Sequence, residues 1–478
     1  MTGSLDIRVA LNRSAVPADQ YLEEPLYAVL DIIPEADLAE ADRPPLNLAL
    51  VVDSSATMHN FQLTDEERDF WLTLAVSRDE MERGQADERH AIYWSGQTLA
   101  DMQAVVRKPM SLAVEAIKSL LQSLRPSDKI TVIAFADQVH SVFGAADWAT
   151  FPDQCLAQLD LLRDQRLPVD IGTGTYMAAA LRLAGEALQQ NAAEAQGINR
   201  LIVISDGIVQ DPDATMLAVS AIQDQGYAIT TLGVGDEFDE EFLIRVADNS
   251  RGEYHYAATS EQITQRLTEE MTSLQTVSVT DMYIAVRGLG GTVIQDIALV
   301  RPAMTLFEEV FTENDWMRAR IGDVSGAAPV AVLVQLAPTS QPQGRHPMAE
   351  AQFTWAVAGG THRGKTQIMI EAEFSSDPLR LARTDEDVSA LVDRFSVYRM
   401  EREAQRAQER GDVEKAREKL GAATRQLRKI GEEQLAEDME GQIAALSGAA
   451  QDAARVKRIK ATTRRLGSAP TTGRPEPQ

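Results

Sequence analysis

The sequence predicts an α/β protein with a doubly wound, mostly parallel sheet, accompanied by a β-sandwich and a C-terminal helical segment. Between residues 46 and 274, apolar runs of strand length alternate with helical patterns, which is typical of parallel strands buried between two layers of helices. From residue 275 to 376 the pattern changes to short strand-like runs separated by Gly, Pro and Ser turns. Residues 385–466 are helical in pattern.

Residues 1–45 come first and contain strand-like runs. Leu5, Ile7, Val9 and Leu11 alternate with polar residues, and Pro44-Pro45 separates these runs from the α/β domain. Because two strands alone are not stable in water, we predict that they belong to the sandwich and that the α/β domain is inserted between its two parts.

The α/β domain is expected to span residues 46–274. Its expected strands are residues 46–52, 129–136, 201–205 and 228–234, and its expected helices are residues 110–124, 152–162, 177–188, 214–222 and 240–247. A sheet of this kind binds ligands at the carboxyl ends of its strands. Asp53 and Asp206 each follow an apolar strand, so we expect the two carboxylates to lie close together.

A candidate metal site begins at Asp53-Ser54-Ser55-Ala56-Thr57, where a carboxylate and hydroxyls follow a buried strand. These are hard oxygen ligands of the kind that suit magnesium. Alone, this pattern is more often a turn or a helix cap. Two separated segments agree with the metal interpretation, however: Gly172-Thr173-Gly174-Thr175 precedes a helical stretch, and Asp206-Gly207 ends another strand.

These three segments together resemble the von Willebrand factor A (VWA) family, whose Rossmann-like domain carries a metal-ion-dependent adhesion site (MIDAS). Gly233-Val234-Gly235-Asp236 and Gly252-Glu253-Tyr254 add to the resemblance, which covers about residues 46–274. The resemblance implies five metal ligands, namely Asp53, Ser55, Thr57, Thr175 and Asp206. It also implies a bound Mg²⁺, with Mn²⁺ or Ca²⁺ as alternatives, and a coordination position that an Asp or Glu of a protein partner completes. Intracellular members of the family suggest a bacterial protein that works within a larger assembly.

Two positions depart from the family pattern. Thr57 replaces the usual Ser but keeps a hydroxyl group, and Thr173 stands where a Gly is common. The second departure leaves the loop geometry open, because a β-branched residue resists the positive φ values that Gly adopts.

Residues 59–107 form an insertion next to the metal motif. A capping-box pattern at residues 64–67 predicts one helix, and Tyr93, Trp94, Leu99 and Met102 indicate a second helical piece. Our hypothesis is that the insertion covers the metal site or selects which partner reaches it; the alternative is a helical hairpin packed on the flank of the domain. His59 is expected to be a solvated loop residue rather than a ligand or base.

The helical segment at residues 385–466 is expected to contain two antiparallel helices, since Gly411-Asp412 has the pattern of a helix stop followed by an N-cap. The basic stretch at residues 455–465 is interpreted as a solvated helix end, or as a surface that binds an acidic partner or the acidic body of this protein. The Pro- and Gly-rich residues 467–478 are expected to be disordered.

Composition excludes several classes of function. The formal net charge of −26 argues against binding to nucleic acids or to anionic membranes, both of which need clustered Lys and Arg. Cys155 is the single cysteine, so neither an intrachain disulfide nor a multi-cysteine zinc site can form. The first residues lack a signal-peptide pattern, and no apolar run approaches the ~18 residues of a membrane span. We therefore expect a cytoplasmic protein; its oligomeric state is not written in the sequence.

Three functions fit these observations. The first is a non-enzymatic adaptor that binds an acidic residue of a protein partner through magnesium. The second is a scaffold whose metal site is structural or empty. The third is a metal-dependent hydrolase that uses Asp53 and Asp206, against which stands the lack of a convincing general base or nucleophile–base pair near the motif. We predict the adaptor and no catalytic residues.

Overall fold

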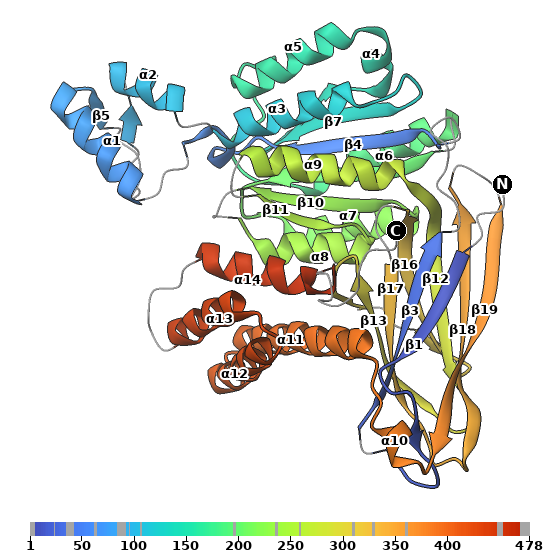
Figure 1. The fold of residues 1–478 in the computed structure, drawn as a ribbon. Coiled ribbons are helices and arrows are strands. Elements are labelled where there is room, and N and C mark those ends of the chain that lie inside the picture. The colour runs from blue at the N-terminus through green and yellow to red at the C-terminus, as the bar shows by residue number, and fades with distance from the viewer. Residues whose placement is uncertain are drawn as a thin grey trace, which may run out of the picture.

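The protein is described here from a computed structural model, which places an α/β domain above a β-sandwich, with a helical segment packed beside both (Figure 1). The structure describes residues 5–22, 24–34, 43–61, 65–83, 92–94, 96–105, 108–194, 197–234, 238–257, 260–307, 311–326, 330–358, 362–446 and 453–468. Within these ranges, none of the helices combines the length and apolar content needed to cross a membrane.

The α/β domain is built on a six-stranded sheet in the order β11-β10-β9-β4-β7-β8. Its strands are β4 (Leu46–Asp53), β7 (Lys129–Phe135), β8 (Val139–Phe143), β9 (Ile198–Ser205), β10 (Ala228–Val234) and β11 (Tyr254–Ala257). All pairings are parallel except that of β8 with β7. Strand β4 lies in the middle and all of its residues are buried, which explains its continuous apolar run. The predicted doubly wound, mostly parallel sheet is confirmed.

Helices cover both faces of this sheet. One face packs against α3 (Pro109–Gln122), α5 (Pro152–Arg163) and α9 (Ser260–Gln275), and α4 (Ala145–Thr150) precedes α5. The other face packs against α6 (Ala178–Glu194), α7 (Pro212–Asp224) and α8 (Glu240–Ser250). Alternate residues of β4 serve the two faces: Leu50 belongs to the first core and Val51 to the second.

The sandwich is built from the chain segments that come before and after the α/β domain. Strands β1 (Leu5–Leu11) and β3 (Leu26–Pro34) join one sheet in the order β1-β3-β17-β13-β14, and β2 (Val16–Pro17) joins the other, in the order β15-β16-β12-β18-β19-β2. The later strands are β12 (Val277–Gly288), β13 (Val293–Arg301), β14 (Thr305–Leu306), β15 (Phe311–Glu313), β16 (Trp316–Ser325), β17 (Val330–Ala337), β18 (Gly344–Val357) and β19 (Arg363–Ser375). The α/β domain thus lies between β3 and β12 in the chain.

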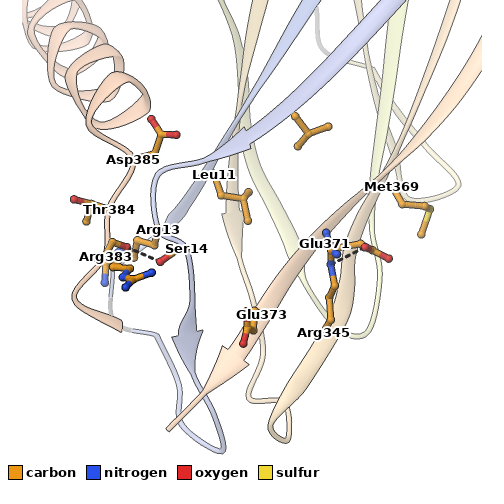
Figure 2. Close-up of a pocket in the computed structure, with 11 residues that line it drawn as sticks. Leu11, Arg13, Ser14, Arg345, Met369, Glu371, Glu373, Arg383, Thr384 and Asp385 are labelled. Carbon is orange, nitrogen blue, oxygen red and sulfur yellow. Dashed lines mark hydrogen bonds and ion pairs between the residues drawn. The ribbon is translucent and has the colours of Figure 1, made fainter. Parts of the chain in front are cut away.

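A groove of about 630 Å³ opens at the end of the sandwich near α10, away from the carboxyl end of β4 (Figures 1 and 2). Leu11 and Met369 contribute apolar surface to it. Acidic and basic side chains alternate along it and several are paired, as in the ion pair of Arg345 with Glu371 at 2.9 Å. The groove therefore has no concentrated charge to select a ligand.

The helical segment contains α10 (Pro378–Leu381), α11 (Glu386–Glu409), α12 (Val413–Lys429), α13 (Glu433–Ala445), α14 (Ala453–Arg465) and η3 (Leu466–Ser468). Helix α11 packs its Phe395 and Tyr398 against the outer face of the first sandwich sheet. The predicted helix boundary is confirmed, since Gly411 has a φ of 76° and the Asp412 side chain accepts a hydrogen bond from the Lys415 amide at 3.1 Å. Of the tail expected to be disordered, Gly467 and Ser468 lie in η3, and residues 469–478 lie outside the described residues.

Helix α14 returns to the α/β domain and meets α8 (Figure 1). Arg464 donates two hydrogen bonds to the Asp248 carboxylate, at 2.9 and 2.7 Å. Lys460 lies 3.4 Å from a carboxylate oxygen of Glu241. At these residues the basic stretch binds the acidic body of the protein itself, which is one of the alternatives that the sequence left open.

The insertion forms a small lobe beyond the end of β4, rather than a hairpin along the flank helices (Figure 1). It contains α1 (Asp65–Arg78), β5 (Met81–Arg83), β6 (Ile92–Trp94) and α2 (Gly96–Val105). The prediction of a helix at Tyr93 and Trp94 was wrong: both residues lie in β6, which pairs with β5, and the helix begins at Gly96. Aromatic residues favour strands, and the helix that follows starts at Gly96, whose φ is positive.

Candidate metal centre

The five predicted site residues come together at the edge of the sheet where β4 and β9 end. These strands are parallel neighbours, so Asp53 and the residue after Ser205 emerge side by side. A backbone hydrogen bond from the Ala56 amide to the Thr173 carbonyl, at 3.1 Å, ties the loop before α6 to the loop after β4. Three distant segments of the chain therefore meet at one place.

A chain of hydrogen bonds connects four of the five residues. The Ser55 amide donates to Asp53 Oδ1 at 2.8 Å, and the hydroxyl oxygens of Ser55 and Thr57 lie 3.0 Å apart. The Thr57 hydroxyl donates to Asp206 Oδ1 at 2.8 Å. Asp53 Oδ2 accepts a further hydrogen bond from the Ser205 hydroxyl at 2.5 Å. Both carboxylates are thus held in fixed orientations by hydroxyl and amide groups.

Thr175, the fifth residue, lies on the other side of Gly207 from Asp53, close to both. A Cβ atom at Gly207 would lie 2.8 Å from Thr175 Oγ1 and 3.3 Å from Asp53 Oδ2. Only a glycine lets the backbone pass so close to both oxygens. Thr57 is partly exposed, whereas the other four residues are buried, so the site opens to solvent on the side of Thr57.

The loop that carries Thr173 resolves the question left by the family pattern. The positive φ of this loop, 83°, falls on Gly172, and Thr173 is not among the described residues with positive φ. The Asp137 carboxylate accepts a hydrogen bond from the Thr173 amide at 3.0 Å. A β-branched residue is therefore accommodated at this position without strain.

Three residues that position the site were missed by the sequence reasoning. Asp137 holds the Thr173 loop, Ser205 holds Asp53, and Asp211 accepts hydrogen bonds from the amides of Met177 and Ala178 at 2.9 and 3.1 Å. Asp211 thereby caps the start of α6, directly after Thr175. A hydroxyl at the end of an apolar strand could have indicated Ser205, but no local pattern links Asp137 or Asp211 to their partners.

The electrostatics of Asp53 favour a cation. Its side chain is fully buried, and burial raises its pKa to about 6, against the opposing effect of hydrogen bonds from Ser205 and Ser55. Among the described residues, none of the groups that lower this pKa is a basic side chain. Two carboxylates and three hydroxyls form an all-oxygen donor set, which fits a hard divalent cation such as Mg²⁺. The residues present therefore fit the ion that the resemblance implies.

His59 differs from its prediction. It is only 3% exposed, and its Nε2 lies 2.9 Å from the Ser54 hydroxyl, behind the metal loop. Burial, together with the nearby charge of Lys108, lowers its pKa to about 4. The short helix η2 (Thr57–His59) turns the ring inward, which the sequence pattern did not reveal.

Comparisons with known proteins identify two regions of the chain. Residues 103–270 match the family model of the von Willebrand factor type A domain. Residues 386–469 match the model of an Sll0103-like, C-terminal alpha-helical domain. The chain contains a VWA domain followed by a C-terminal helical domain, as these matches and the fold agree.

One relative by sequence is the protein YfbK of Escherichia coli K12, described as uncharacterized. It is 25% identical over 167 residues, which cover 34% of this chain and 28% of the relative. The match thus concerns one part of each protein, and it brings no activity with it.

Solved structures extend the likeness to the whole architecture. A von Willebrand factor type A protein from Catenulispora acidiphila has a TM-score of 0.68 at 15% identity and covers 96% of both chains. The human COPII-coat protein Sec24c has a TM-score of 0.52 at 12% identity and covers 89% of this chain and 57% of that one. At these identities the likeness shows the fold alone.

Proposed function

We propose that this chain is a non-enzymatic adaptor whose VWA domain binds an acidic residue of a protein partner through a bound divalent cation, Mg²⁺ by preference. The observation that carries the proposal is the buried Asp53 carboxylate. It sits among hydroxyl groups, and no basic side chain in the described part of the chain acts on its pKa. A protein-interaction role agrees with the VWA domain, and the metal and the acidic partner are the finer parts of the proposal.

Each of the five residues has a part in this scheme. The hydroxyls of Ser55, Thr57 and Thr175 would bind the cation, while Asp53 and Asp206 would bind directly or through water. Neutral hydroxyl ligands leave a magnesium ion electron-poor, so it attracts one more carboxylate. Because Thr57 is the partly exposed member of the set, a partner's Asp or Glu would approach on its side.

The charge of the protein makes the cation essential to this interaction. At a net charge of −26, the bare protein repels an acidic partner, and a bound cation supplies the local attraction. The same charge disfavours nucleic acids and anionic membranes as partners. We propose a cytoplasmic location, which agrees with a chain that has one buried cysteine and so forms no intrachain disulfide.

The environment of His59 supports a role without catalysis. It is the imidazole next to the metal loop, and its pKa of about 4 makes it a weak general base at neutral pH. Its Nε2 is also engaged with Ser54. This favours binding over hydrolysis at the site.

Affinity purification of the full chain with and without Mg²⁺ tests the proposal. We expect a partner that is retained with Mg²⁺, lost on chelation and lost in Asp53→Ala. Asp213→Ala is the matched control, because it removes an exposed carboxylate from the first turn of α7 outside the site.

Two other results would replace the proposal. Retention of the partner both after chelation and in Asp53→Ala would make the chain a scaffold with a structural or empty metal site. Turnover of phosphoesters that disappears in Asp206→Ala would make it a hydrolase.

A further inference from the structure

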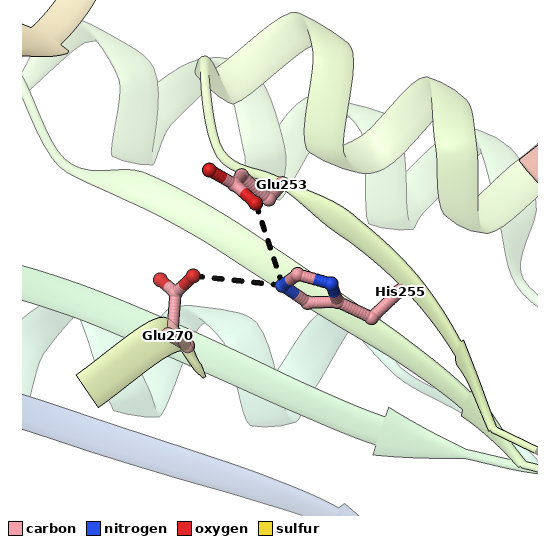
Figure 3. Close-up of side chains that lie close together, drawn as sticks. All are labelled: Glu253, His255 and Glu270. Atoms are coloured by element: carbon pink, nitrogen blue, oxygen red, sulfur yellow. Dashed lines mark ion pairs between the residues drawn. The ribbon is translucent and has the colours of Figure 1, made fainter. Parts of the chain in front are cut away.

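A second group of possible metal ligands lies on the same domain, outside the site described above. Glu253 directly precedes β11 and His255 is the second residue of that strand, so the two side chains lie on the same face. Glu270 points toward them from α9, which covers that face (Figure 3). One ligand atom from each of these three residues lies within 4.8 Å of the others.

The position of His255 points to a missing ligand. The ring is 4% exposed, and its Nε2 makes no hydrogen bond. The nearest carboxylate oxygens of Glu253 and Glu270 each lie 3.6 Å away from it. That separation is too long for a hydrogen bond. It matches the roughly 3.3–3.6 Å between two ligands that are each about 2.0–2.2 Å from one tetrahedral zinc ion.

We propose that Glu253, His255 and Glu270 bind a divalent cation of the zinc class, with water in the fourth position. An imidazole nitrogen beside two carboxylates favours zinc over magnesium, unlike the all-oxygen set at Asp53. A cavity of about 80 Å³ is lined by Glu253 and Glu270, and also by Arg200 and Arg464, so it offers room for that water beside the two carboxylates. This site does not depend on the function proposed for the first one.

Neighbouring groups fix the orientation of the Glu270 carboxylate. Its Oε1 accepts a hydrogen bond from the Thr230 hydroxyl at 2.7 Å and lies 3.5 Å from Nε of Arg200. Its other oxygen, Oε2, is the one directed at His255. A carboxylate oriented in this way loses little freedom when it binds an ion.

Arg465 of α14 competes with a cation for the imidazole ring of His255. Its guanidinium lies 3.1 Å from Nδ1 of His255, and because a guanidinium can only donate, Nδ1 accepts and the ring proton sits on Nε2. A cation on Nε2 needs the proton on Nδ1, so Arg465 has to turn away when the ion binds. Arg464 remains bonded to Asp248, so α14 stays docked while its neighbour is released.

Cobalt, which replaces zinc and absorbs visible light strongly when tetrahedral, tests the site in the full chain. The titration is made in excess Mg²⁺, which fills the hard oxygen site. We expect one Co²⁺ per chain with tetrahedral absorption, kept in Asp53→Ala and lost in His255→Ala. Glu253→Gln, at a half-buried position, is expected to weaken binding at least tenfold without changing the melting temperature. Absence of tetrahedral bands, or bands that persist in both His255→Ala and Glu253→Gln, overturns the proposal.

A second pair of variants tests the competition with Arg465. Arg465→Gln removes a positive charge and offers an amide oxygen to the proton on Nδ1, so we expect Co²⁺ to bind roughly tenfold more tightly. Arg465→Lys keeps the charge and the donors, and its affinity should match that of the wild type. Equal affinity in all three proteins overturns the role given to Arg465.

Discussion

Buried carboxylates occur at two places on the same domain, and their surroundings differ. One place is the candidate metal centre; the other, called the seam, is where α14 meets α8, β11 and the neighbouring residues Arg200 and Glu270. At the metal centre Asp53 meets hydroxyls and an amide, and burial raises its pKa to about 6. At the seam burial also raises the pKa of Glu270, but the Arg200 guanidinium and a hydrogen bond from the Thr230 hydroxyl act against it, and that pKa lies below its ordinary value. A cation that approaches Asp53 therefore meets no opposing positive charge among the described residues that act on this carboxylate. At the seam an incoming ion must compete with a guanidinium.

Removal of one partner from the Arg464–Asp248 pair should give the largest effect on stability. Both side chains are almost fully buried, at 7% and 10% exposure. In Arg464→Met the Asp248 carboxylate is left buried without its partner, which should cost about 3–5 kcal/mol. Chemical denaturation monitored by fluorescence measures the loss.

The double variant Arg464→Met with Asp248→Leu is the control for that experiment. It replaces both charges with apolar side chains, so we expect it to recover most of the stability. A double variant as unstable as the single one would mean that α14 is held by packing and not by neutralisation of Asp248.

The metal centre should respond to added ions instead. Mg²⁺ at 100 times its dissociation constant should stabilise the protein by about 2.7 kcal/mol, because the folded state alone binds it. Asp53→Ala should lose this gain, whereas Asp213→Ala should keep it. Thermal unfolding with a series of Mg²⁺ concentrations measures the effect, and an unchanged melting temperature in the wild type would contradict a cation site at Asp53.

The grouping of the five candidate ligands follows from the sequence far more directly than the contacts at the seam, and the reason is physical. Asp53 and Asp206 follow apolar strands directly, and parallel strands bring their carboxyl ends to one edge. At the seam, Glu253 and His255 are close in sequence, but Glu270 arrives through helix packing and Arg465 from the far end of the chain. No local pattern specifies contacts of that kind.

Local patterns also explain which of the other predictions agree with the structure and which do not. The predicted fold class followed from the alternation of apolar runs and helical patterns, which depends on local periodicity. Tyr93 and Trp94 were assigned to a helix, although their β-strand preference is realised by pairing with β5. His59 was expected in solvent because the sequence does not show which way a short helical turn directs a ring.

Gly207→Ala should change the shape of the candidate metal centre without changing its charge. The new methyl group would lie 2.8 Å from Thr175 Oγ1, closer than atoms tolerate, so we expect Thr175 to shift. The cost in stability should be about 1–3 kcal/mol, and Mg²⁺ affinity should fall with the carboxylates intact. Isothermal titration calorimetry with Mg²⁺ measures the affinity.

Gly421→Ala is the matched control for this substitution. Gly421 lies within α12, and the nearest atom to a new Cβ there is a flexible Arg425 nitrogen at 3.7 Å. Alanine favours helices over glycine, so stability should stay the same or rise slightly. If Gly207→Ala bound Mg²⁺ like the wild type, Thr175 would not be needed as a ligand.

The smallest expected effect concerns Glu241, where the seam meets α11. Burial raises the pKa of Glu241, but Arg402 at 2.9 Å and Lys460 at 3.4 Å outweigh it, so the pKa lies below its ordinary value. The unfolded carboxylate takes up its proton near pH ~4.3. The ion pairs therefore contribute stability above that pH, and the contribution is lost as the pH falls toward the lower pKa of the folded state.

Glu241→Gln should flatten the acid side of the stability curve, by less than about 1 kcal/mol because the side chain is partly exposed. Denaturation midpoints at a series of pH values from neutral to acidic measure it, with the exposed Glu414→Gln as the matched control. Curves of the wild type and Glu241→Gln that run parallel would show that Arg402 and Lys460 do not stabilise this carboxylate. The positive charges that balance the seam carboxylates would then be those of Arg464, Arg465 and Arg200. The contrast with the candidate metal centre would apply only around Asp248, His255 and Glu270.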